Sequence, residues 1–281
     1  MDKRAAITII FIFFLAVSTL SGCSEEPESF SFSRTELPLI SFMGFEIPVF
    51  PTARDQMNYA KSGFPDSREK IAAFKALFKL FPEFRLECGE AALSLAYLNL
   101  GVDYRFAQKK DILAAVQDYN TVLQNFKEVP QIIVKTYWYL GWLHCNLLHE
   151  KREGLDFFWQ IVKSYPGIQM GISSPVPWVS LVYPATGKTS HPEEKKIKKK
   201  WGALALLEIV EHAADKTETV KAFDCLWQAY PGTVSTGLAI KYLLKKKIHI
   251  QKVLPCAETY LDLNIANSFL SDEIRILKGE F

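Results

Sequence analysis

Histidine, cysteine and acidic side chains are the residues of this chain that could bind a metal or move protons. His144 and His149 are five positions apart and would not share a helix face, unlike the four-residue spacing of zinc-binding helices. Glu208, Glu211 and His212 would lie near one helix face, a pattern that is common on solvated helices. No nucleophile, base and orienting residue can be named together. The sequence therefore predicts no enzyme, no catalytic residue, no metal site and no cofactor.

Cys23 stands in a context that points to a different chemistry. It closes an apolar segment that begins after Lys3 and Arg4, and the three residues before it are Leu, Ser and Gly. The apolar run is shorter than the ~20 residues that a membrane-spanning helix needs. Leu20–Cys23 resembles the lipobox of bacterial lipoproteins, in which the cysteine thiol is lipidated and becomes the N-terminus after cleavage. The resemblance implies a lipoprotein signal peptide over residues 1–22 and lipidation of Cys23.

The same resemblance implies a location. The lipid would attach the chain to a membrane of the bacterial cell envelope. Ser24 follows the cysteine, whereas an Asp there favours retention in the inner membrane, so the outer membrane facing the periplasm is predicted. Without residues 1–22 the chain keeps 31 basic and 30 acidic side chains, which argues against a nucleic-acid partner. The four remaining cysteines fall within apolar helical patterns, which favours buried thiols, although an exported chain could form disulfides.

Residues 167–199, called the insertion here, interrupt the helical patterns with four prolines and three glycines. A spacer would be polar, but Pro175–Pro184 is apolar, so we predict that this segment docks against the helices. A run of lysines follows, which is either a solvated face or a contact for anionic lipid head groups or an acidic partner. The predicted partner-binding residues are Trp178, Leu181, Tyr183, Lys198, Lys199 and Lys200.

Amphipathic helices must position these residues. Apolar residues recur at helical spacing over 52–62, 66–81, 86–100, 109–126, 131–148, 150–165, 201–214, 218–232 and 234–246, and 253–278 fits two shorter helices. The short connections between them favour antiparallel neighbours. Residues 23–51 are polar and then punctuated by prolines, which predicts a tether or extended segment.

One frame recurs in four of these helices. It consists of an acidic residue, an aromatic residue eight positions later, an aliphatic residue three further on and a second aromatic four after that. The four sets are Asp66, Phe74, Leu77 and Phe81; Asp111, Tyr119, Val122 and Phe126; Glu150, Phe158, Ile161 and Tyr165; and Asp215, Phe223, Leu226 and Tyr230. An acidic residue suits a helix start, and the apolar positions share one face. The frame predicts repeated helix pairs.

The central pair resembles a tetratricopeptide repeat. Tyr137, Leu140-Gly141, Gly154, Phe158, Ile161 and Pro166 occupy the positions that carry the resemblance. His144 replaces the usual Tyr, and the turn between the two helices is about one residue longer than the ~34-residue period allows. The resemblance implies an all-α fold, an α-solenoid of antiparallel helix pairs over residues 52–281 whose concave face binds a partner.

Together these features predict a lipid-anchored envelope scaffold. It would bind a protein or peptide through a groove of the helical repeats, in outer-membrane or envelope assembly. The alternative is an envelope carbohydrate-binding module or enzyme accessory subunit that uses aromatic residues near the insertion, including Trp178 and Trp201.

Overall fold

The computed structural model describes residues 37–62, 64, 66–101, 107–169, 200–263 and 268–279. Within these residues the chain is mostly helical, with one small sheet, which confirms the prediction of a helical protein at that level. The predicted signal peptide, Cys23, most of the tether and residues 170–199 of the insertion lie outside the described residues. Two compact units meet in sequence between Phe50 and Pro51, and each is described by itself.

The first unit contains a β-hairpin. Strands β1 (Leu39–Phe42) and β2 (Phe45–Pro48) pair antiparallel, with Leu39 opposite Pro48 and Phe42 opposite Phe45. The turn residues Met43 and Gly44 both have positive φ angles, 54° and 82°, as the tight turns of two-residue hairpins require. Glycine adopts such angles without strain. The sequence predicts an extended segment here, and that prediction does not include the turn.

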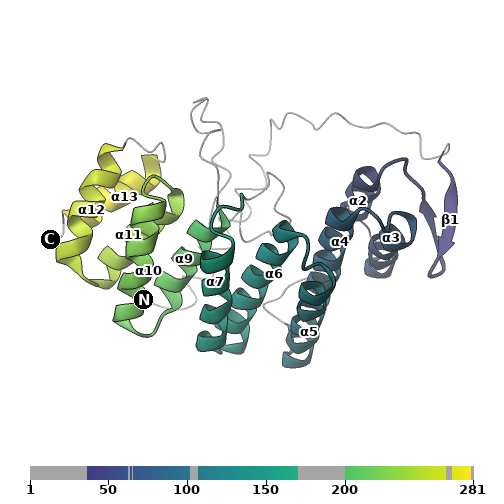
Figure 1. Cartoon of the computed structure of the whole chain (residues 1–281), viewed down its shortest axis with the longest axis horizontal. Helices are drawn as coiled ribbons and strands as arrows, with labels where there is room; N and C mark the ends of the chain where they lie inside the picture. The colour runs from purple at the N-terminus through teal and green to yellow at the C-terminus, as the bar shows by residue number, and fades with distance from the viewer. Residues whose placement is uncertain are drawn as a thin grey trace, which may run out of the picture. The chain divides into compact units, whose positions relative to one another are not determined.

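The second unit is built from helices that follow each other along the chain (Figure 1). They are α2 (Ala53–Lys61), α3 (Ser67–Leu80), α4 (Arg85–Leu98), α5 (Lys109–Asn125), α6 (Pro130–Leu143), η2 (His144–Leu148), α7 (Lys151–Ser164), α9 (Trp201–His212), α10 (Lys216–Ala229), α11 (Val234–Lys246), α12 (Ile250–Asp262) and α13 (Ser268–Lys278). The predicted helix ranges agree with these bounds to within a few residues, and this part of the prediction is confirmed.

The helices of this unit form two layers. Each helix packs on the next one in sequence, from α2 to α13. In addition α2, α4, α6, α9, α11 and α13 pack on one another in that order, and we call them layer A. Helices α3, α5, α7, α10 and α12 alternate with them and form layer B. A short helix has only one apolar stripe, so stacking pairs in this way builds a continuous core that no single pair could form.

The four helices that carry the recurring frame all belong to layer B. The first aromatic residue of each frame is at most 2% exposed: Phe74, Tyr119, Phe158 and Phe223. The last aromatic residue is the C-cap of its helix in all four cases, with φ from −142° to −126° and ψ from 24° to 49°: Phe81, Phe126, Tyr165 and Tyr230. The frame therefore marks the same inward face and the same end in each helix.

The acidic residue of the frame is the N-cap in three of the four helices. The Asp66 carboxylate accepts the Arg68 backbone N–H at 2.7 Å, and Asp215 accepts that of Thr217 at 3.0 Å. Glu150 is the N-cap of α7 without a side-chain bond. In α5 the N-cap is Gln108, and the helix begins at Lys109, the first residue of its predicted range. Asp111 lies at the third helical position and accepts the Gln108 backbone N–H at 3.2 Å in a reciprocal capping box.

The extra residue predicted between the helices of the central pair lies in a π-helical turn. Residues His144–Leu148 form η2 directly after α6, and a π-turn holds one more residue than an α-turn. His149 follows with a φ of 60° and Glu150 donates its backbone N–H to the His144 carbonyl at 2.8 Å. The π-turn thus lets α7 begin in register with the core despite the longer connection.

Candidate functional site

The described part of the chain contains one of the predicted partner-binding residues, Lys200. The other five, Trp178, Leu181, Tyr183, Lys198 and Lys199, lie outside the described residues, as does the predicted docking segment Pro175–Pro184.

Lys200 lies where the insertion returns to the helices. It forms an isolated antiparallel bridge with Gln169, and the Trp201 backbone N–H donates to the Ile168 carbonyl at 3.2 Å. The Lys200 ammonium lies 5.6 Å from the centre of the Tyr230 ring. Helices α7 and α9 pack directly on each other. Residues 170–199 therefore leave and rejoin the array at one point without interrupting its helix packing.

Trp201 has a structural role beside this point. It is 1% exposed, and its ring centre lies 6.1 Å from that of Trp138, which is fully buried. A tryptophan that stacks on a sugar must present one face to solvent. The interpretation of Trp201 as a carbohydrate-binding residue is therefore wrong.

The structure shows a groove at a position that the sequence does not predict. It has a volume of about 640 Å³ and lies between α3 and α5, with α4 as its floor. Its walls carry Ile71, Phe78, Val122 and Phe126, and its floor carries Ala92, Leu95 and Ala96. The groove opens between two helices of layer B, so we treat it as the candidate functional site.

Polar residues fix both ends of the groove. At one end Arg85 donates through Nε to the Glu128 carboxylate at 2.7 Å and through Nη2 to the Asn125 carbonyl, and its guanidinium lies 4.4 Å from the centre of the Phe126 ring. At the other end the Asn99 amide donates to the Asp118 carboxylate. These groups already bind each other and keep the ends of the groove in shape.

Lys75 lines the same groove from α3 and differs from these end groups. Lys75 is exposed, and no carboxylate of the described residues forms an ion pair with its ammonium group. Lys75 is thus a positive charge on the groove wall that is available to a partner.

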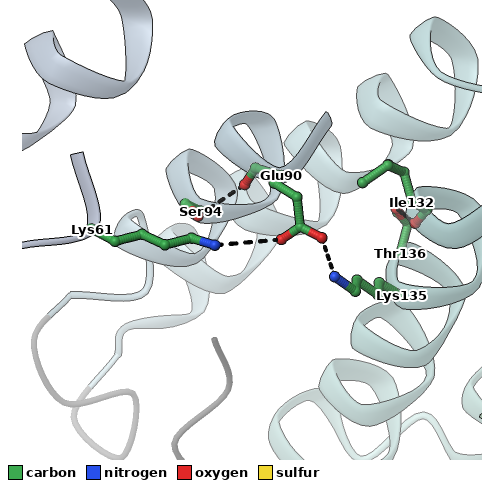
Figure 2. Close-up of polar contacts among 6 residues, drawn as sticks. All are labelled: Lys61, Glu90, Ser94, Ile132, Lys135 and Thr136. Carbon is green, nitrogen blue, oxygen red and sulfur yellow. Dashed lines mark hydrogen bonds and ion pairs between the residues drawn. The ribbon is translucent and has the colours of Figure 1, made fainter. Parts of the chain in front are cut away.

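A charged cluster joins three helices of layer A (Figure 2). Glu90 of α4 lies between Lys61 of α2 and Lys135 of α6. Lys135 donates to one carboxylate oxygen of Glu90, and the Lys61 ammonium lies 3.9 Å from the other. Burial lowers the pKa of Lys61, Glu90 partly opposes this shift, and Lys135 adds to it. Lys135 is only 8% exposed. The cluster is therefore a contact between helices rather than a binding surface.

The acidic pattern on α9 is only partly solvated, because Glu208 is buried and Glu211 is exposed. Glu208 is 6% exposed, and its carboxylate lies 3.5 Å from Nε2 of His212. Loss of solvent, and then the neighbouring Glu208 charge, raise the pKa of Glu211 to about 7. Among the described residues no group of three or more His, Cys, Asp or Glu side chains is placed to hold a metal ion.

The four cysteines of the described residues are free thiols. Cys88 and Cys145 are buried, as predicted, and burial raises the pKa of Cys145 to about 12. Cys225 and Cys256 are only partly buried, so the prediction of buried thiols is wrong for these two. Within the described part of the chain, no helix combines the length and the apolar character that crossing a membrane requires.

Comparisons with known proteins found no match among protein-family models, curated proteins or solved structures.

Proposed function

We propose that this chain is a lipid-anchored scaffold of the bacterial cell envelope that binds a protein or peptide through its helical array. The observation that carries the proposal is the groove of about 640 Å³ between α3 and α5. Grooves between helices bind partner segments through apolar contacts and a few placed polar groups.

The finer architecture belongs to the same proposal. The array is a solenoid of helix pairs similar to tetratricopeptide repeats, and it acts in outer-membrane or envelope assembly. Three features support the repeat: the alternation of layers A and B, the shared inward face of the frame and the matching C-caps of four layer-B helices. Repeat arrays of this kind offer extended surfaces to protein partners.

The anchor is tested at Cys23. Cys23→Ser removes the thiol that would take the lipid, so labelled palmitate should enter the wild-type chain and not the variant, and the variant should remain at precursor length. A variant at the neighbouring Ser24, Ser24→Ala, should be labelled like the wild type. Equal labelling of the Cys23→Ser variant would show that the lipobox interpretation is wrong.

Partner binding is tested in the envelope itself. Membranes that contain the lipidated chain are crosslinked, and the adducts are identified and compared with those of the Cys23→Ser variant. A discrete protein adduct that requires the anchored chain is expected. An anchored chain that forms no adduct with any envelope protein would contradict the scaffold function.

A further inference from the structure

We propose that the groove between α3 and α5 binds an amphipathic helix of a partner protein, with the partner's apolar stripe on α4 and an acidic side chain against Lys75. The inference rests on the proposed scaffold function and names the chemistry of the partner. It places that partner between helices of layer B, whereas the sequence predicted binding at the insertion.

The shape of the groove fits a helix. Arg85 and Asn99 mark its two ends along α4, and fourteen residues of helix span about 21 Å. Ala92 and Ala96 keep the floor low, so the backbone of a second helix can approach it closely. Ile71 and Phe78 on α3 are part-exposed and can receive side chains at positions i, i+3, i+4 and i+7 of a docked helix.

An extended peptide fits the groove less well. Extended peptides that bind through their backbone add a strand to a sheet edge, because the edge offers unpaired backbone groups. The lining of this groove comes from α3, α4 and α5 and from the cap residues that follow them. Helices bond their backbone groups internally, so the groove presents side chains and no strand edge. The occupant is therefore a helix that contributes its own apolar stripe.

The charge of the partner follows from an equivalence between layer-B helices. In two of the four frame helices, the residue after the first aromatic contacts the next layer-B helix, whereas in α5 this residue is Asn120, which is exposed. In α7 this residue is Trp159, whose Nε1 donates to Glu218 of α10 at 2.9 Å. In α10 it is Asp224, which pairs with Lys252 of α12 at 2.6 Å. In α3 it is Lys75, which lines the groove and forms no ion pair with a described carboxylate.

Lys75 therefore occupies a position that is paired in two other helices. The charged groups of the groove lining are Lys75, Arg85 and Asp118, and Arg85 is neutralised by its ion pair with Glu128. Arg85 and Asp118 already have partners, whereas no described carboxylate pairs with Lys75. An acidic side chain on the docked helix would give Lys75 the counterpart that Lys252 gives Asp224. Such a pair would select acidic over basic helices and orient the bound helix.

The test uses the full chain, purified in detergent micelles, and a displayed library of random peptides of roughly 15 residues, about the length of α4. The enriched peptides should carry apolar residues at helical spacing with Asp or Glu beside the stripe. Their dissociation constants are then measured by fluorescence anisotropy against wild-type and variant chains.

Two pairs of exposed positions separate the groove from the rest of the surface. Thr121→Trp fills the groove from α5, and Gln124→Trp is its control on the same helix outside the lining. Lys75→Glu reverses the groove charge, and Lys109→Glu is the matched control. The two groove variants should weaken binding about tenfold or more, and the controls should leave it within about twofold. Replacing the peptide's acidic residue by Lys should restore binding to the Lys75→Glu chain.

The other possible results of the binding experiment would each overturn a different part of the proposal. Enriched peptides that bind the groove variants as well as the controls would overturn the groove assignment and leave the scaffold function standing. A library that yields no binder would contradict both. If sedimentation shows a dimer that Thr121→Trp converts to monomer, the groove holds a second copy of the chain and the inference is wrong. Circular dichroism of each variant confirms that the array is folded.

Discussion

The gap between α3 and α5 and the gap between α7 and α10 separate helices with the same inward face but different outward residues. The rings of Phe74 and Phe158 are both buried at the same position of the frame. Next to Phe158, Trp159 reaches α10, where it bonds to Glu218 and lies 5.3 Å from the Lys221 ammonium. Next to Phe74, Lys75 reaches no partner on α5, and a groove remains. The residue after the first aromatic thus differs between the two gaps. Trp159 contacts α10, whereas Lys75 lines a groove.

The largest effect is expected where the two regions are alike. Phe158→Ala and Phe74→Ala should each lower the free energy of unfolding by about 3–5 kcal/mol, because both remove a large ring from a closed core. Denaturant unfolding measures the loss. Phe157→Ala is the control, since Phe157 is only partly buried and should cost less. Similar stability of the wild type and the Phe74→Ala chain would show that the two regions do not share one core.

A middle-sized effect is expected when the outward residues are exchanged. Trp159→Lys removes a part-buried ring with its hydrogen bond and cation contact, and should cost about 1–2 kcal/mol of unfolding free energy. The reverse change, Lys75→Trp, should stay within about 0.5 kcal/mol of the wild type, because Lys75 is exposed.

The same two substitutions should differ in their effect on the binding of groove peptides. Lys75→Trp should abolish it, because the indole would occupy the gap and the positive charge would be lost. Trp159→Lys should leave the α3–α5 groove and its peptide binding unchanged. If Trp159→Lys weakened binding as much as Lys75→Trp, the two gaps would not be independent sites.

The smallest expected effect is a pH-dependent change in stability that originates at Glu211 of α9. Because the pKa of Glu211 is raised to about 7 in the folded chain, the folded state favours the protonated acid. The stability that Glu211 contributes is therefore fully present below its ordinary pKa and is lost as pH rises through about 7. Glu211→Gln should raise the Tm slightly at pH 8 and leave it unchanged at pH 4. The change should be small, since the Glu211 residue keeps part of its surface in water. An equal shift at both pH values would contradict this origin.

The sequence predicted the local features well because they depend on neighbouring residues. Helix ranges follow from apolar spacing, and the frame found an inward face that the structure confirms at Phe74, Tyr119, Phe158 and Phe223. It placed the start of α5 at residue 109, as in the structure, but the spacing alone does not show that Asp111 is a capping-box residue rather than the N-cap. It missed the hairpin turn at Met43–Gly44, although a glycine between apolar runs is a signal for one.

The groove could not be predicted in the same way. Its existence depends on how far α3 and α5 lie apart, and the two helices are separated in sequence by α4. Periodicity shows which side of a helix is buried but not the distance to a helix two elements away. The burial of Trp201 and Glu208 has the same cause, since both are covered by helices distant in sequence. A comparison of the residues after the four first aromatics, Lys75, Asn120, Trp159 and Asp224, was the one signal that could have indicated an unfilled position.

The bridge between Gln169 and Lys200 marks a point of the array where one chain segment could be exchanged for another. Paired residues of antiparallel strands have Cα atoms about 5 Å apart, a distance that a tight turn can span. The chain between them could be shortened, lengthened or exchanged for another domain without moving α7 or α9, which pack directly on each other. Loop-closure entropy rises slowly with length, so such exchanges cost little stability. Lineages carrying this array could therefore change what is displayed there while the helical scaffold stays the same.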